Sequence, residues 1–385
     1  DKYMPETMAG GGLFFDYDND GWLDVFFVNG GSFTDKRIAE AATHRLYRNK
    51  GNGTFADVSA SSGIGVSGYG MGACSADYDN DGFVDLYITA VGPNKLYHNT
   101  GKGKFVDVTT ASGAVSDLWS ASCAFGDIDN DGDVDLYVSR YVDFSVSNNK
   151  YCRLLENVRG YCHPNVYNGV TDILFRNNGN GTFTDISREA GVYKVGNGLG
   201  VVFGDYDGDG WVDIYVANDM TPNFLFHNKG HGMFEEAAFW AGVAVGTDGK
   251  PLAGMGTDMG DINGDGLLDL FVTNLDGQTH NLYRNLGKGL FADATFQSGI
   301  GEATLPYVGF GAAFFDYDND SDLDLAVANG DVIDNVQLLK DSTSYAQLNL
   351  LLQNDGSGKF KSVGPTSGRG FALKKPSRAL AVGDI

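Results

Sequence analysis

The chain has 385 residues, 55 glycines and a formal net charge of −23, and these figures exclude several classes of protein. Nucleic-acid binding needs a basic face, and the acidic surplus also disfavours adsorption to anionic lipid. With 42% hydrophobic and 12% aromatic residues the chain is not intrinsically disordered, and no apolar run approaches the ~20 residues of a membrane-spanning helix.

A nine-residue acidic pattern, Asp-x-Asp-x-Asp-Gly-x-x-Asp, recurs along the whole chain. The fifth copy has Asn263 at its third position, and the sixth has Ser321 in place of glycine. The copies begin at Asp16, Asp77, Asp127, Asp205, Asp261 and Asp316. They recur every ~50–80 residues, which is typical of the blades of a β-propeller.

Each repeat is predicted to hold four short antiparallel strands. In the second repeat a glycine-spaced segment precedes the acidic loop, and the segments Asp85–Thr89, Lys95–Asn99 and Gly103–Val108 follow it. Their two-residue alternation and glycine-rich turns are typical of antiparallel strands. One such sheet cannot bury both of its faces alone, so radial stacking of the sheets is expected to form the core.

These features predict an all-β fold, a single β-propeller domain over residues 1–385. Gly383-Asp384-Ile385 matches Gly126-Asp127-Ile128, so a seventh repeat is expected to begin at the end of this sequence. The predicted blades span residues 8–63, 64–113, 114–191, 192–243, 244–300 and 301–363, with a partial seventh over 364–385 and an insert at 141–171 in the third.

The repeat unit, with its trailing Leu-Tyr-Arg-Asn and Gly-x-Gly-x-Phe, resembles the FG-GAP/VCBS repeat that integrin α-subunit propellers also use. The segment from Glu6 to Gly12 and the motif Tyr161-Cys162-His163-Pro164 are similar to secreted, cartilage-acidic-protein-like (ASPIC/UnbV-type) bacterial proteins. The resemblance implies a seven-bladed architecture.

The acidic loops are predicted to bind Ca²⁺, a hard cation that takes six to eight oxygen ligands. Carboxylates at positions one, three, five and nine and the carbonyl of position seven would form the shell, and glycine at six allows the sharp turn. The expected ligands are Asp16, Asp18, Asp20, Trp22 and Asp24; Asp77, Asp79, Asp81, Phe83 and Asp85; Asp127, Asp129, Asp131, Asp133 and Asp135; and Asp205, Asp207, Asp209, Trp211 and Asp213. The fifth and sixth loops supply Asp261, Asn263, Asp265, Leu267 and Asp269, and Asp316, Asp318, Asp320, Asp322 and Asp324.

Ordinary polar turns and EF-hands are the two alternatives to calcium-binding propeller loops. Asp, Asn and Gly also fill ordinary polar turns, but several like charges at fixed offsets repel one another unless a cation lies between them. EF-hands lie between helices and end in glutamate at position twelve, whereas these loops have strand-like flanks. The fifth loop is expected to bind less tightly because it has one charge fewer, and Ser321 must adopt the conformation of a glycine.

The cysteines and histidines suggest structural roles. A disulfide between Cys152 and Cys162 would stabilise the insert and indicates an oxidising compartment. Cys74 and Cys123 lie at offsets that differ by one, so opposite pleat faces favour free buried thiols. His98 and His227 occupy the position of Arg48 in other repeats, which indicates a structural strand position.

Three inserts fall between the second and third strands of their blades, at the end away from the acidic loops. Such one-sided insertions often mark a binding face, although neutral drift of surface loops is an equal alternative. We therefore expect an extracellular, cell-surface or periplasmic scaffold for a protein or glycan partner, such as an adhesion protein. A lectin, and a subunit of a filament or assembly completed by a partner strand, are the alternatives. An enzyme is not expected, because no nucleophile–base pair is evident.

Overall fold

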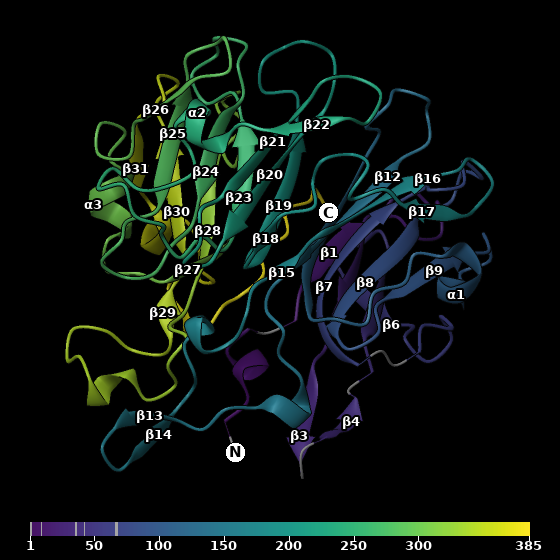
Figure 1. Cartoon of the computed structure of the whole chain (residues 1–385), viewed down its shortest axis with the longest axis horizontal. Helices are drawn as coiled ribbons and strands as arrows, with labels where there is room; N and C mark the ends of the chain where they lie inside the picture. Colours follow the sequence, from purple (N-terminus) through teal and green to yellow (C-terminus); the bar gives the residue numbers. More distant parts are fainter. Residues whose placement is uncertain (1, 9, 35–36, 42, 66–67) are drawn as a thin grey trace. The chain divides into compact units, whose positions relative to one another are not determined.

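The computed structural model describes residues 2–8, 10–34, 37–41, 43–65 and 68–385. They form two compact units, one of residues 1–195, 230–233 and 381–385 and the other of residues 196–229 and 234–380. Within the described residues, six four-stranded antiparallel sheets follow one another along the chain (Figure 1). This confirms the predicted all-β propeller with four strands in each complete repeat.

Three blades belong to the first unit and three to the second. Blades one to three are β1 (Gly12–Phe15), β2 (Asp24–Phe27), β5 (Arg45–Asn49) and β6 (Phe55–Asp57); β7 (Tyr69–Ala76), β8 (Asp85–Val91), β9 (Lys95–Asn99) and β10 (Phe105–Asp107); and β11 (Ser120–Gly126), β12 (Asp135–Arg140), β16 (Ile173–Asn177) and β17 (Phe183–Asp185). Blades four to six are β19 (Gly198–Gly204), β20 (Asp213–Asn218), β21 (Phe224–Asn228) and β22 (Phe234–Glu236); β23 (Thr257–Gly260), β24 (Asp269–Val272), β25 (Asn281–Asn285) and β26 (Phe291–Asp293); and β27 (Gly309–Phe315), β28 (Asp324–Asn329), β30 (Leu350–Asn354) and β31 (Phe360–Ser362).

The remaining elements lie in the connections and inserts. The short strands are β3 (Gly31–Thr34), β4 (Arg37–Ala41), β13 (Cys152–Leu155), β14 (Val158–Gly160), β15 (Val170–Thr171), β18 (Val195–Gly196), β29 (Gln347–Leu348) and β32 (Lys374–Lys375). The helices are α1 (Thr109–Ser112), α2 (Ala238–Ala241), α3 (Ile300–Thr304) and the 3₁₀ turns η1 (Met4–Thr7), η2 (Val146–Asn148), η3 (Pro164–Val166), η4 (Val336–Leu338) and η5 (Gly364–Thr366). No described helix has the length and apolar character needed to cross a membrane.

The core lies between neighbouring blades of the same unit, as expected for sheets that cannot bury both faces alone. Phe26 of blade one packs in one cluster with Leu86 of blade two. Leu86 is fully buried, as are Tyr87 and Leu136. Tyr87 and Leu136 belong to the cluster between blades two and three. Blades four to six are joined in the same way by two further clusters.

In blades two, three, five and six the asparagine that ends the third strand connects adjacent blades, a role that the sequence analysis did not assign. Asn99 Nδ2 donates hydrogen bonds to the carbonyl oxygens of Tyr17, 2.7 Å away in the preceding blade, and of Val84, 3.1 Å away. The same inter-blade bond runs from Asn177 to Tyr78, at 2.7 Å. The repeated asparagine is therefore explained by buried carbonyl groups that need a donor.

The prediction of free thiols at Cys74 and Cys123 was wrong, because these cysteines form a disulfide. Their Cα atoms are 5.7 Å apart, and both side chains belong to the core between blades two and three. The two facing surfaces of stacked sheets are opposite pleat faces, so the difference of one in offset favours pairing. The predicted disulfide between Cys152 and Cys162 is confirmed, with its Cα atoms 5.2 Å apart.

The described residues do not show a seventh blade. Residues 364–385 contain η5 and the two-residue β32, which pairs with β29. Further along, Ser377 N–H donates to Asn329 O at 3.0 Å, and Gly311 N–H donates to Arg378 O at 2.8 Å. These two hydrogen bonds join residues 377–378 to blade six.

One buried carboxyl group in blade three replaces an asparagine of blade two. Asp172 is 2% exposed; its Oδ1 accepts from Arg140 N–H at 2.7 Å and its Oδ2 from the Tyr137 hydroxyl at 2.9 Å. In blade two, Asn94 accepts from a backbone N–H at 3.0 Å and donates to the Tyr87 hydroxyl at 3.1 Å. Burial raises the pKa of Asp172 to about 7.

Asp172→Asn is expected to raise the melting temperature at pH 8 and to have little effect at pH 4. The folded-state pKa lies above the unfolded value, so the wild-type chain loses stability as the pH rises from ~4 to ~7, and the uncharged amide avoids this loss. Burial of the charge costs of the order of 1–3 kcal/mol, equal to a few degrees. Thermal melts of both proteins across this pH range measure the effect. An equal or lower melting temperature for the variant at pH 8 would contradict it.

Candidate metal centres

All six acidic loops share one hydrogen-bond pattern, shown here by the loop of blade two. Asp77 Oδ1 accepts from Asp81 N–H at 3.0 Å, and Asp77 Oδ2 accepts from Gly82 N–H at 2.8 Å. Asp81 Oδ1 in turn accepts from Phe83 N–H at 2.9 Å. Gly82 has φ = +91°, which a side chain would strain. Hydrogen bonds from backbone N–H groups to the carboxylates at positions one and five thus hold the loop in its folded shape.

The aspartate at position nine is the most deeply buried acid of each loop. Asp85 is 0% exposed; its Oδ2 accepts from Tyr78 N–H at 3.2 Å and its Oδ1 from Asn99 N–H at 2.7 Å. Burial raises the pKa of Asp85, and equally of Asp135 and Asp213, to about 7. A nearby cation would favour the charged form of each of these groups and would offset the cost of burying it.

The aspartate at position three is the acid that the loop's own hydrogen bonds do not explain. One carboxylate oxygen of this residue is buried and has no hydrogen-bond partner in each of the first four loops. These atoms are Oδ1 of Asp18, Asp79, Asp129 and Asp207. A buried carboxylate oxygen is costly without a donor or a cation, so the same orphaned atom in four loops fits a metal ligand.

Loops five and six differ at this position, in the direction that the sequence predicts. Asn263 Oδ1 accepts from Asp265 N–H at 3.1 Å, and Asn263 Nδ2 donates to Asp265 Oδ2 at 2.9 Å. In loop six, Asp318 Oδ2 accepts from Gln353 Nε2 at 2.7 Å. Ser321 has φ = +74°, as expected for a residue in the place of glycine, and this conformation costs of the order of 1 kcal/mol.

The structure brings three of the predicted carboxylates together within each of loops one to three. Among the described residues, single oxygens of the acids at three positions lie within 4.8 Å of one another in several loops. Examples are Asp16, Asp18 and Asp24; Asp77, Asp79 and Asp81; and Asp127, Asp129 and Asp135. The spacing suits ligands that surround one cation, and the carbonyl ligands at position seven stay a prediction.

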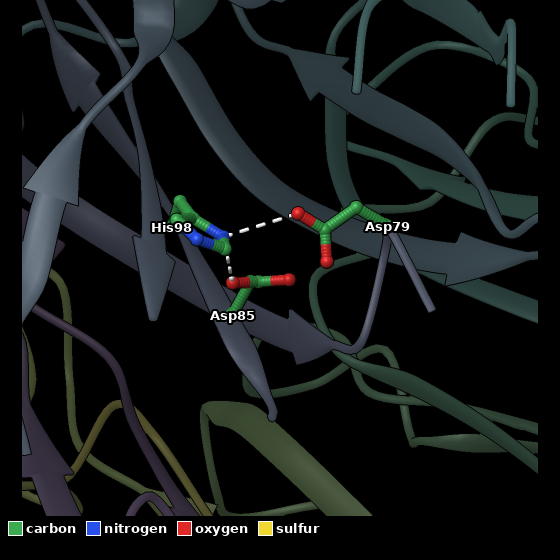
Figure 2. A group of neighbouring side chains, drawn as sticks. All are labelled: Asp79, Asp85 and His98. Carbon is green, nitrogen blue, oxygen red and sulfur yellow. Dashed lines mark ion pairs between the residues drawn. The ribbon is translucent and has the colours of Figure 1, made fainter. Parts of the chain in front are cut away.

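The sequence missed the contact between the loops and the residue that precedes the repeated asparagine. In blade one this residue is Arg48, whose Nε lies 2.7 Å from Asp18 Oδ2 and whose Nη2 lies 2.8 Å from Asp20 Oδ2. In blade two His98 takes this place, beside Asp79 and Asp85 (Figure 2). The sequence signal for this contact is the position that Arg48 and His98 share in the repeat, from which we predicted only a structural role.

Two other histidines are structural. His44 Nδ1 and His280 Nδ1 each accept a backbone hydrogen bond of 3.1 Å, from Asn29 N–H and Asn274 N–H. Burial lowers the pKa of His44 to about 4 and that of His280 to about 3. Both rings are therefore neutral at physiological pH and support the end of the second strand.

Comparison with solved structures supports the propeller fold. A lectin from Agrocybe aegerita that specifically recognises non-reducing terminal N-acetylglucosamine is similar, with a TM-score of 0.50 and 17% sequence identity. The similarity covers 92% of this chain and 80% of the lectin chain. At this level of identity the similarity shows the fold alone.

Comparison with sequences supports the repeat family. Cartilage acidic protein 1 of Homo sapiens is 35% identical over 148 residues, which are 38% of this chain and 21% of the relative. The protein of the same name from Mus musculus is 39% identical over 112 residues, 28% of this chain and 17% of the relative. The chain thus spans about a fifth of the length of these relatives.

A model of the FG-GAP-like repeat matches five overlapping segments, which together cover most of the chain. The matched segments are residues 16–88, 77–138, 166–216, 205–272 and 261–327. Each matched segment contains at least one acidic loop, and all except residues 166–216 contain two. The chain therefore belongs to the FG-GAP-like repeat family, with a β-propeller fold and similarity to cartilage acidic protein 1.

Proposed function

We propose that this protein is an extracellular interaction scaffold whose blades are held rigid by Ca²⁺ in the acidic loops. The observation that carries the proposal is the buried, unpartnered Oδ1 of the third-position aspartate in loops one to four. Around it, the acids of each loop offer oxygen ligands, which calcium prefers. Loop five would bind more weakly because Asn263 removes one charge, and loop six because Ser321 has to hold a positive φ in the place of glycine.

The extracellular location is supported by covalent bonds. All four cysteines of the chain are paired, and such disulfides persist in oxidising compartments. A calcium-dependent fold also suits an environment in which this ion is abundant. We propose that the partner of this scaffold is another protein.

The long insert of blade three supports a partner at the end away from the acidic loops. It connects β12 to β16, whereas the acidic loop connects β11 to β12. Tyr151 in this insert is 65% exposed, and the guanidinium groups of Arg159 and Arg153 lie 4.8 and 5.9 Å from its ring centre. Exposed tyrosine and arginine are the residues that most often dominate protein interfaces.

The test is a calorimetric titration of Ca²⁺ into chelator-treated wild-type protein and into Asp129→Asn. Asp129 lies in loop three, and its amide replacement keeps the size of the side chain but removes a charge. The variant is expected to bind one Ca²⁺ fewer, or to bind one Ca²⁺ at least about tenfold more weakly. The control is Asp117→Asn, outside the loops, which is expected to titrate as the wild type does. An Asp129→Asn isotherm that matches the wild type would refute the assignment of this loop.

A further inference from the structure

The loop of blade two has a nitrogen atom among its carboxylates. His98 Nδ1 lies 3.1 Å from Asp79 Oδ2 and 3.3 Å from Asp85 Oδ1, so the ring faces both groups (Figure 2). Its other nitrogen, Nε2, lies 3.9 Å from Asp81 Oδ2. Nδ1 is buried and makes no hydrogen bond, although two carboxylate oxygens are near. The protonated ring would form an ion pair with either aspartate, whereas the neutral ring could share a cation with both.

The distances fit a shared metal ion better than a pair of hydrogen bonds. Ligand bonds of ~2.0–2.2 Å in tetrahedral geometry place neighbouring ligand atoms ~3.3 Å apart, close to the two measured separations. Asp79 also has the orphaned Oδ1, which leaves the acid free to orient toward a cation. Imidazole nitrogen favours ions such as Zn²⁺ and Co²⁺ over Ca²⁺, which prefers oxygen ligands.

Blades one and four show why blade two is distinct. In blade one, the Arg48 guanidinium takes the place of the imidazole and, as a fixed cation without a lone pair, it cannot bind a metal. In blade four, His227 Nδ1 lies 3.4 Å from Asp207 Oδ2 but is within hydrogen-bond geometry of Asp213 Oδ1, at 3.3 Å. Of the two imidazoles, that of His98 is the one whose Nδ1 is buried without a hydrogen-bond partner.

We propose that the loop of blade two is a mixed nitrogen–oxygen centre that binds a divalent transition ion, with His98 Nδ1, Asp79 and Asp85 as ligands. The inference rests on the proposed function in one respect, that the acidic loops bind cations. It adds that this one loop selects Zn²⁺ or a similar ion in the presence of Ca²⁺. The loops without a nitrogen ligand, and the loop of blade four, whose His227 Nδ1 is within hydrogen-bond geometry of Asp213, stay with Ca²⁺.

The test uses the full chain, freed of metal with a chelator and then saturated with millimolar Ca²⁺. Zn²⁺ binding is measured by calorimetry, and Co²⁺ absorption reports whether a nitrogen ligand is present. The variants are His98→Arg, which copies blade one, and His98→Gln, which copies the neutral residue of blade six. Both are expected to weaken Zn²⁺ binding by at least about tenfold and to remove the Co²⁺ band, while His98→Gln leaves Ca²⁺ binding within about twofold.

His163→Gln is the matched control, because it removes an imidazole from the insert and is expected to change neither signal. Loss of Zn²⁺ binding in His98→Arg but not in His98→Gln would show an effect of charge alone and would overturn the inference. Unchanged Zn²⁺ binding in both variants would overturn it as well, while normal Ca²⁺ binding would leave the proposed function standing. If the wild-type protein bound neither Ca²⁺ nor Zn²⁺, the proposed function itself would be overturned.

Discussion

Removal of Ca²⁺ with a chelator is expected to lower the melting temperature of the chain by roughly 10–15 °C. An ion present at 100 times its dissociation constant stabilises the folded state by about 2.7 kcal/mol, or about 11 kcal/mol for four independent sites. The entropy of unfolding of a chain of this length is about 0.8 kcal/mol per kelvin, which converts that free energy into the stated shift.

The physical source of this effect is the concentration of like charges in each loop. Without a cation, Asp77, Asp79, Asp81 and Asp85 repel one another, and the buried carboxyl of Asp85 has a raised pKa. Differential scanning fluorimetry with and without chelator measures the shift, and readdition of Ca²⁺ must restore it. Mg²⁺ is expected to restore less, because it prefers an octahedral shell that retains water. A melting curve that does not respond to the chelator would contradict the prediction.

The double substitution Cys74→Ala and Cys123→Ala is expected to destabilise the chain by roughly 4 kcal/mol. The disulfide closes a loop of 49 residues, and the loop-entropy account gives about this value for such a length. The bond also joins strands β7 and β11 of adjacent blades, so its loss removes a covalent link across the core between them. Denaturant unfolding at equilibrium measures the change in the free energy of unfolding.

The matched control is Cys152→Ala with Cys162→Ala, in the insert of blade three. That disulfide closes only 10 residues, so roughly 3 kcal/mol is expected from the same account. Its loss is also expected to leave the blades intact, because it lies within one connection. A larger loss of stability from the insert pair than from the inter-blade pair would show that loop length and blade contact do not govern the two bonds.

Repetition made most of the fold and the loops predictable from the sequence. Six acidic patterns at the same offsets, each flanked by residues that alternate in polarity, predicted both the blades and the loop geometry. The positive φ of Ser321 also followed, because it is a local departure from a repeated pattern, while the weaker binding expected of loop five stays a prediction. Because the acidic pattern occurs six times, each copy supports the structure predicted from the others.

Relations between blades were harder to predict, because they depend on how sheets face one another. The prediction of free thiols treated Cys74 and Cys123 as residues of one sheet, where opposite pleat faces prevent contact. In stacked sheets, opposite pleat faces of adjacent blades lie against each other, so the two cysteines meet. The role of Asn99 was missed for the same reason, since its acceptor, Tyr17 O, belongs to the preceding blade. His98 was missed because only the folded loop shows its nitrogen beside two carboxylates.

The number of Ca²⁺ ions bound by the chelator-treated wild-type chain tests the central claim most directly. It can be measured by equilibrium dialysis with metal analysis, at a free Ca²⁺ concentration in the millimolar range. We predict at least three tightly bound ions when Zn²⁺ occupies blade two, four when Zn²⁺ is absent, and weaker binding at loops five and six. Fewer than four tightly bound ions in the absence of Zn²⁺ would contradict the account, because at least one loop with an orphaned carboxylate oxygen would then lack the cation that explains it.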